Sequence, residues 1–100
     1  MSILTEAEAL INGDRQEAYG HPAENFKDIA TGWDVILKGE GPITPKQIAL
    51  CMTWTKMCRE TNKPQRDNIV DGVGYLGTVE LIEDYNEEIK WNEDHKKLYN

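Results

Sequence analysis

The amino-acid sequence contains no long apolar run, only two cysteines and fewer basic than acidic residues. No apolar run approaches the roughly 18–20 residues that cross a membrane, so we expect no membrane partner. The N-terminus lacks the basic start and apolar stretch of a signal peptide, which predicts a cytoplasmic protein. The net charge of −7 argues against a nucleic-acid polymer as a partner, because contacts with its phosphates need clustered lysines and arginines.

The acidic residues are concentrated near the C-terminus. Residues 80–100 hold seven acids and three lysines, a net charge of −4, whereas residues 1–79 hold eleven acids and eight bases, a net charge of −3. We interpret the C-terminal acidity as a solubility feature. Candidates for binding a charged ligand therefore lie in the rest of the chain.

The two cysteines, Cys51 and Cys58, lie seven residues apart in one expected helix. Two helical turns separate them by about 10 Å, which is too far for a disulfide. We interpret both thiols as small core residues.

The apolar residues recur at helical spacing, and no useful segment alternates apolar with polar residues, which predicts an all-α fold. We expect a compact bundle of about four helices in a single domain, residues 1–91, followed by a frayed polar tail, residues 92–100. The expected helices cover residues 4–12, 22–38, 45–62 and about 66–91. Residues 14–21 form a connection that is helical in part.

Caps and breakers set these helix boundaries. Ser2 or Thr5 caps the first helix, and Gly13 ends it with an available left-handed conformation. Pro22 and Pro45 suit the first turns of the next two helices, and Thr44 caps the second of these.

The third helix is apolar over most of its circumference, which predicts burial on nearly every side. A protomer of 100 residues leaves each of four helices a free flank, so we expect a homo-oligomer that associates through the helix at residues 44–62. The fourth helix is expected to bury two neighbouring rows of apolar side chains, which are Ile69, Val73 and Leu76 beside Val70 and Leu81.

Charged residues flank the short connection between the third and fourth helices. Lys56, Arg59 and Lys63 share one helix face, and Asp67 and Asp71 begin the next helix. In an antiparallel hairpin these groups converge. They then form either a site for a phosphorylated ligand, since arginine takes phosphate with a planar donor fork, or a cluster of structural ion pairs.

Three glycines interrupt the fourth helix, at residues 72, 74 and 77. Each is less favourable than alanine by roughly 1 kcal/mol. Close packing of another backbone would offset that loss, and so would room for a ligand beside Asp71 and Tyr75.

A second polar cluster lies in the first connection and the start of the second helix. It combines cationic, aromatic, imidazole and amide side chains with three acids: Arg15, Tyr19, His21, Asn25, Asp14, Glu24 and Asp28. The sequence contains no catalytic triad order, zinc-ligand spacing, Walker loop or dinucleotide fingerprint.

These blocks resemble a group of small phage and prophage proteins of unassigned function. The matching stretches are D-R-Q-E-A-Y-G-H-P-A-E-N-F at residues 14–26, Trp33, K-M-C-R at residues 56–59 and R-D-N-I-V-D-G-V-G-Y at residues 66–75. The resemblance covers about residues 3–85. In helix order and length such proteins are similar to the all-α nucleoside triphosphate pyrophosphohydrolases of the MazG type, which are homo-oligomeric bundles that hold Mg²⁺ with acids on two helices.

The chain departs from the acid pattern of those enzymes. They carry E-E-x-x-E on one helix and E-x-x-D on the next, whereas the third helix here offers no acid before Glu60. A Mg²⁺ site would have to use Glu24, Asp28, Asp67 and Asp71 instead. Cations in place of half the carboxylates suit a phosphate better than a metal, which favours binding without turnover.

Three functions follow from this pattern. The first is a phage-encoded protein that binds a small nucleotide without a cofactor and so sequesters a signal of host defence. The second is a Mg²⁺-dependent pyrophosphohydrolase, and the third is a helical adaptor that binds a host protein. For the first, the expected ligand-binding residues are Arg15, Tyr19, Asn25, Trp33, Lys56, Arg59, Lys63, Asp71 and Tyr75.

Overall fold

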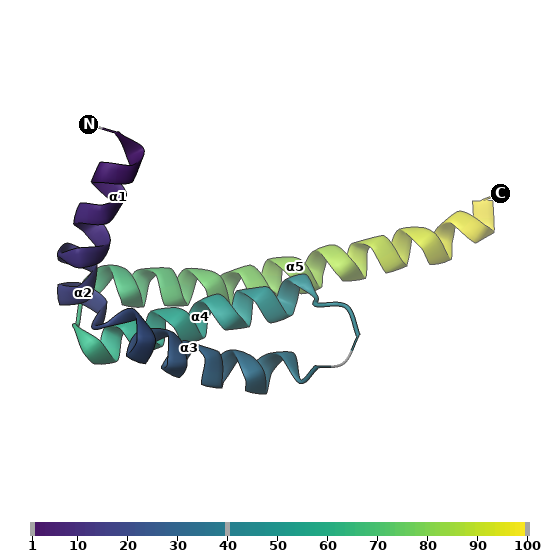
Figure 1. Ribbon diagram of the computed structural model, residues 1–100. Helices are drawn as coiled ribbons and strands as arrows, with labels where there is room; N and C mark the ends of the chain where they lie inside the picture. Colours follow the sequence, from purple (N-terminus) through teal and green to yellow (C-terminus); the bar gives the residue numbers. More distant parts are fainter. Residues whose placement is uncertain (1, 40, 100) are drawn as a thin grey trace.

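The computed structural model describes residues 2–39 and 41–99, with side chains as far as Lys96. All the regular elements of the described chain are helices and none is a strand, so the all-α prediction is confirmed. The helices, labelled in Figure 1, are α1 (Ile3–Asn12), α2 (Asp14–Tyr19), α3 (Pro22–Leu37), α4 (Pro45–Asn62) and α5 (Arg66–Tyr99). No helix within the described residues has the length and apolar character to cross a membrane.

Local capping explains where most of these helices begin. The Ser2 hydroxyl accepts a hydrogen bond from the backbone N–H of Thr5, and this bond caps α1. Thr44 and Gln47 form a reciprocal capping box at the start of α4. The Nδ1 atom of His21 accepts the Ala23 amide at 3.1 Å, so the first turn of α3 is capped by this side chain.

The first connection is helical in part, as expected, because most of it forms the short helix α2. One turn and one helix boundary differ from the expected ones. Gly13 joins α1 to α2 with a φ of −127°, outside the left-handed region. The last helix continues to Tyr99 instead of ending near Trp91. No glycine or proline follows Gly77, and the His95 ring stacks on Trp91 one turn earlier, with ring centroids 3.8 Å apart. Asn100, the end of the expected tail, lies outside the described residues.

Helices α3, α4 and α5 form an open layer with α4 in the middle, as Figure 1 shows. Helix α4 packs against both neighbours, whereas α3 and α5 do not touch within the described chain. The radius of gyration is 18.7 Å, compared with about 13 Å for a compact domain of 100 residues. The expected compact bundle is therefore not what one protomer forms.

The contact between α3 and α4 depends on two tryptophans that donate hydrogen bonds to backbone carbonyls. Trp33 Nε1 lies 3.0 Å from the Cys51 oxygen, and Trp54 Nε1 lies 3.1 Å from the Asp28 oxygen. The Trp54 ring lies over Gly32, where an added Cβ would come within 2.1 Å of the indole nitrogen. Glycine at this position lets the ring fill the space between the helices.

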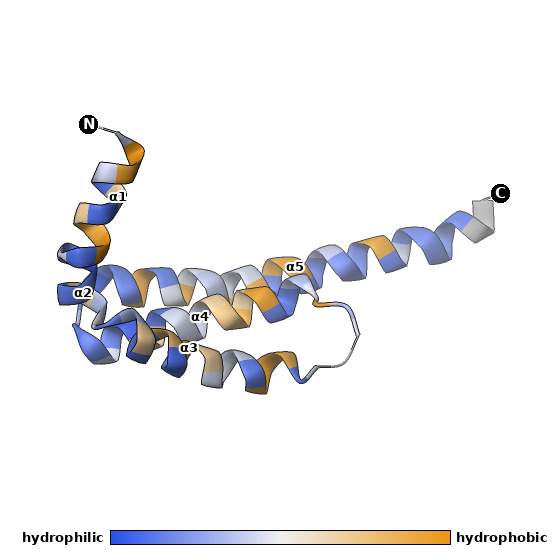
Figure 2. Cartoon of the chain, in the orientation of Figure 1, coloured by the Kyte–Doolittle hydropathy of each residue, from blue (hydrophilic) through white to orange (hydrophobic). Residues whose placement is uncertain are grey.

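Helix α4 is only partly buried within one protomer, so its expected burial on nearly every side, which included a subunit interface, stays a prediction. Ala49 and Cys51 are buried, but Ile48 and Met57 are exposed. For α5, the expected burial does not occur within one protomer. Both apolar rows that were expected in the core are exposed, and Figure 2 shows α5 as apolar segments separated by polar ones. The row of α5 that faces α4 includes Asn68 and Gly72, which are buried.

Candidate functional site

Tyr19 and Arg59 bring α2 and α4 together at one end of the layer. The Arg59 guanidinium carbon lies 4.5 Å from the centroid of the Tyr19 ring, a cation–π contact. Such contacts contribute roughly 0.5–2 kcal/mol, and more as water is excluded. The buried Nε of Arg59 has no hydrogen-bond partner in the part of the chain that the structure describes. The ring therefore holds the guanidinium in place while leaving donors free.

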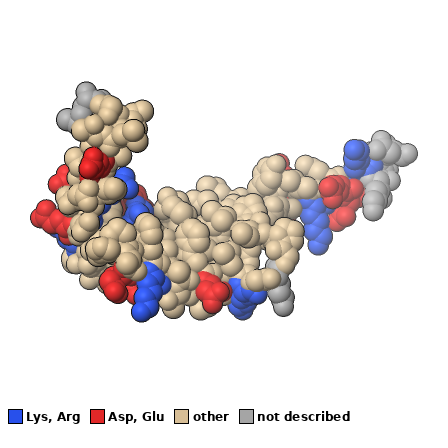
Figure 3. Space-filling view, in the orientation of Figure 1, with Lys and Arg blue, Asp and Glu red and all other residues tan. Residues whose placement is uncertain are grey.

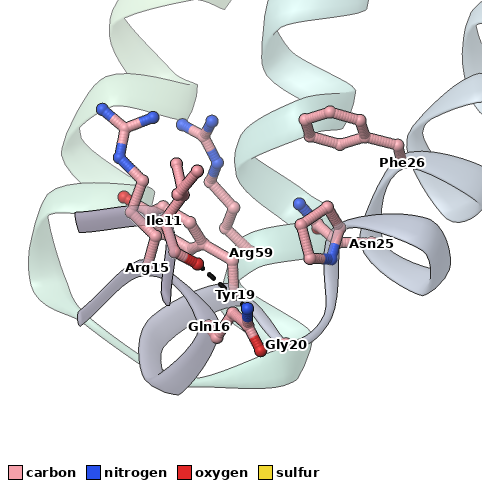
Figure 4. A pocket seen from close by; sticks show the side chains of 9 residues that line it. Ile11, Arg15, Gln16, Tyr19, Gly20, Asn25, Phe26 and Arg59 are labelled. Carbon is pink, nitrogen blue, oxygen red and sulfur yellow. Dashed lines mark hydrogen bonds between the residues drawn. The ribbon is translucent and has the colours of Figure 1, made fainter. Parts of the chain in front are cut away.

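A cavity of about 110 Å³ opens beside this pair. Figure 4 shows Arg15 from α2 and Arg59 from α4 on its wall, with Asn25 and Phe26 from α3 beside them. We call this cavity the arginine pocket; its lining is Ile11, Arg15, Gln16, Tyr19, Gly20, Pro22, Asn25, Phe26 and Arg59.

The arginine pocket carries two positive charges and no carboxylate in its lining, although the chain has a net charge of −7. Asn25 is buried, whereas the Phe26 ring is 63% exposed. Two guanidinium groups at one cavity repel each other unless an anion lies between them. The pocket therefore has the chemistry of an anion site with an aromatic side chain at its edge.

The turn from α2 to α3 holds Tyr19 in position. Gly20 has a φ of +83°, a conformation that favours glycine, and an added Cβ would lie 3.3 Å from the Asn62 side-chain oxygen. The side-chain Nδ2 of Asn62 donates a hydrogen bond to the Ala18 carbonyl at 2.8 Å. This bond ties the end of α2 to the end of α4.

Four of the residues expected to bind ligand, Arg15, Tyr19, Asn25 and Arg59, line this one cavity. Sequence reasoning missed Phe26, although it follows Asn25 directly and lies one helical turn after Pro22. It also missed Ile11 and Gln16, whose side-chain amide donates to the Ile11 carbonyl at 3.0 Å. For Ile11 the signal was spacing, because Ile11, Arg15 and Tyr19 recur every four residues.

The remaining expected residues lie elsewhere. Lys56 Nζ pairs with the Asp71 carboxylate at 2.9 Å, so these two form an ion pair between α4 and α5. Trp33, which also bonds the Thr55 hydroxyl, packs between helices and does not line the arginine pocket. Lys63 follows α4 as its C-cap, and Tyr75 is half-buried on α5.

The acids proposed for Mg²⁺ come from two helices that do not touch. Glu24 and Asp28 lie on α3, and Asp67 and Asp71 lie on α5. Among the described residues, no three histidine, cysteine or acidic side chains lie close enough to hold a metal ion.

The cysteines lie in the layer as free thiols. Burial raises the pKa of the Cys51 thiol. The same cause raises the pKa of Cys58, with a further contribution from the negative charge of Asp28. Both thiols are therefore protonated and poor nucleophiles near neutral pH.

Comparison with known protein families gives one match. The family described as "Domain of unknown function (DUF6378)" matches residues 2–83. The chain belongs to this family. The match covers the arginine pocket completely and ends within α5.

Two curated phage proteins are similar to this member of the family. It is 40% identical to the Gene 55 protein of Mycobacterium phage L5 over 84 residues, which are 83% of this chain and 53% of the phage protein. It is 44% identical to the Gene 55 protein of Mycobacterium phage D29 over 82 residues, 81% of this chain and 53% of that protein. The chain thus spans about half the length of these relatives. No solved structure matches it.

Proposed function

We propose that this protein binds a small phosphorylated nucleotide in the arginine pocket and holds it without turnover. The observation that carries the proposal is the pairing of Arg15 and Arg59 in one cavity without a carboxylate. Guanidinium groups match phosphate oxygens with parallel N–H donors, and these charge-assisted bonds are about twice as strong as neutral ones. A group with two negative charges satisfies both arginines.

Tyr19 makes this site ready for a ligand. Because its ring already holds the Arg59 guanidinium, that long side chain loses less conformational freedom when the ligand binds. Immobilising a free side chain of this kind opposes binding by about 0.5–1.5 kcal/mol. In this proposal Tyr19 binds the ligand indirectly, by positioning the cation.

The size of the pocket decides which part of the ligand enters. A cavity of about 110 Å³ is smaller than the roughly 300–1,000 Å³ that enclose whole ligands. We propose that the phosphate enters between the arginines and that the base lies outside, against the exposed Phe26 ring. Stacking on an aromatic ring contributes about 1–3 kcal/mol per base. Asn25, which is buried in the lining of the pocket, then hydrogen-bonds the phosphate or the sugar next to it.

Binding without turnover is supported by the placement of the acids. Phosphate cleavage with Mg²⁺ needs several carboxylate oxygens around the metal, and the four candidate acids are divided between α3 and α5. The similarity to phage proteins suggests a biological setting. In the host cytoplasm, a phage protein that sequesters a nucleotide signal of host defence would silence that signal.

Isothermal titration calorimetry tests the proposal with inorganic phosphate, nucleoside monophosphates and triphosphates, and cyclic nucleotides. Each titration is run with and without Mg²⁺, and the products are separated by chromatography. We expect at least one nucleotide to bind without Mg²⁺ and to be recovered intact after heat release. New products would instead indicate a hydrolase, and a panel without any binding would favour the adaptor function.

Two substitutions with a matched control locate the site. Arg59→Ala should weaken binding ten- to a hundredfold, because a charge-assisted bond contributes about 1.5–3 kcal/mol. Arg59→Lys keeps the charge but loses the planar fork, and should fall between Arg59→Ala and the wild type. Lys27→Ala removes one exposed positive charge from α3 outside the pocket. Equal losses from Lys27→Ala and Arg59→Ala would show that only net charge matters.

A further inference from the structure

One face of α5 is apolar and uncovered. Ile69, Val70, Val73, Leu76 and Leu81 are all at least 49% exposed. At 100° per residue these five side chains span about 140° of the helix, and among residues 69–81 only Glu80 adds a charge within that arc. Contiguous apolar surface of this kind marks an interaction site in soluble proteins. We call these five residues the α5 face.

The α5 face differs from the row that packs on α4. Asn68 and Gly72 are buried in that row, and Val73 points about 100° away from Gly72 around the helix. Between the two rows lies a hollow of about 330 Å³, bordered by Met57 of α4 and by Ile69, Val73 and Leu76. Its lining is mainly apolar, so a neighbouring side chain that entered it would displace water from apolar surface.

The layer also exposes more surface than a folded monomer of its mass. The chain exposes 8037 Å², whereas a compact protein of 11.4 kDa exposes about 5,800 Å², so the excess is roughly 2,200 Å². Part of this excess belongs to α1 and to the projecting end of α5. Obligate homodimers bury about 1,000–2,500 Å² per partner, so the excess is as large as such an interface requires.

We propose that a second copy of this chain covers the α5 face with its own α5 face, across a twofold axis. A single layer of helices cannot enclose a core, and domains are built from two or more packed layers. The second copy supplies the missing layer. A twofold interface uses the same patch on both subunits, and an apolar patch with one acid is compatible with itself.

The glycines of α5 fit this arrangement. An added Cβ at Gly74 or Gly77 meets no atom within 4 Å in the protomer, so nothing in one chain offsets their low helix propensity. Gly77 lies about 40° from Val73 around the helix, within the α5 face. Another backbone can therefore approach closely there. The interface is thus assigned to α5, in contrast to the self-association through residues 44–62 that the sequence suggested.

Figure 3 shows how charges are distributed over one side of the layer. Lysine, arginine, aspartate and glutamate side chains gather near α1 and α2, along the lower edge and on the projecting end of α5, and the middle carries few of them. Two copies that meet at the middle of α5 therefore bring few charged side chains of the same sign together.

A pair of valine substitutions tests the α5 face. Val73 is 64% exposed on α5 and Val35 is 65% exposed on α3. Val35→Lys is therefore a matched control for Val73→Lys, because both place a lysine at an equally exposed valine. Light scattering and sedimentation at micromolar concentration should show a dimer for the wild type and for Val35→Lys. Val73→Lys should raise the dimer dissociation constant at least ~100-fold, because it desolvates an ammonium group in both copies. Circular dichroism confirms that each variant remains helical.

Several results would overturn the proposal. A monomeric wild type would mean that another occupant, such as α1 or a different protein, covers the α5 face. A dimer that Val73→Lys leaves intact would place the interface elsewhere, as would a dimer that only Val35→Lys breaks. Nucleotide titration of the Val73→Lys monomer keeps this test separate from the arginine pocket, because every residue of that pocket comes from one protomer.

Discussion

The contact between Gly32 and the Trp54 ring allows one stability effect to be estimated. In Gly32→Ala the new methyl group would lie 2.1–2.3 Å from three indole atoms, so the ring must move. Overpacking of this kind destabilises by about 1–3 kcal/mol, and loss of the Trp54 bond to the Asp28 carbonyl adds about 0.5–1.5 kcal/mol. The higher helix propensity of alanine offsets about 1 kcal/mol. We expect a net loss of roughly 1–3 kcal/mol.

Thermal unfolding at a fixed protein concentration measures this loss. For a domain of this size, 1 kcal/mol shifts Tm by about 4–8 °C, so Gly32→Ala should melt roughly 5–20 °C below the wild type. Asp34→Ala introduces the same residue at an exposed position of the same helix, and should leave Tm unchanged or slightly higher. If Gly32→Ala matched this control, the Trp54 ring would not lie over Gly32 and the packing of α3 on α4 would need another basis.

Three further substitutions or treatments test other contacts. Asn62→Ala removes the hydrogen bond to the Ala18 carbonyl, so it should lower the free energy of unfolding by about 1 kcal/mol. It should also weaken phosphate binding, because Tyr19 is displaced. The control Asn92→Ala changes an exposed residue of α5, and calorimetry should show neither a lower stability nor weaker phosphate binding. Asp71→Asn should lower the free energy of unfolding in urea by at most about 1 kcal/mol, since the aspartate of the pair is 46% exposed, and salt should reduce the effect; a larger loss that salt does not change would contradict the exposed pair. Because burial raises the pKa of the Cys58 thiol, iodoacetamide should label this thiol more slowly in the folded protein than in urea at neutral pH. Labelling should accelerate in alkaline solution, and stability should decline as pH rises above about 8.5, where unfolded thiols lose their protons first; rapid labelling of the folded protein at pH 7 would refute the burial.

Local signals made the helix starts predictable from the sequence. Thr44 before Pro45, and His21 before Pro22, sit directly at observed helix starts, because capping involves residues only two to four positions apart. The pairing of Arg59 with Tyr19 depends instead on α2 lying against the end of α4. That contact joins residues forty positions apart, so the sequence placed Arg59 with Asp67 and Asp71, its neighbours along the chain.

The apolar rows of α5 show a second limit. Periodicity identified Ile69, Val73 and Leu76 as one face, and that face exists. The pattern does not show which element covers the face, because an apolar row has the same sequence spacing whether it is buried in a bundle or exposed on a layer. Likewise, the sequence offered Trp33 as a ligand-binding residue, but its indole N–H donates to the Cys51 carbonyl, a partner that only the packed structure supplies.

The weak packing of helix α1 links its local opening to the arginine pocket. This helix packs only on α2 within the described chain, and an isolated helix of ten residues is marginal in water. Its local opening therefore needs far less free energy than unfolding of α4, so its amides should exchange hydrogen with solvent early. Ile11, near the end of α1, borders the arginine pocket. If the pocket binds a ligand as we propose, contact with Ile11 should slow the hydrogen exchange of α1, and this exchange would then report whether the pocket is occupied.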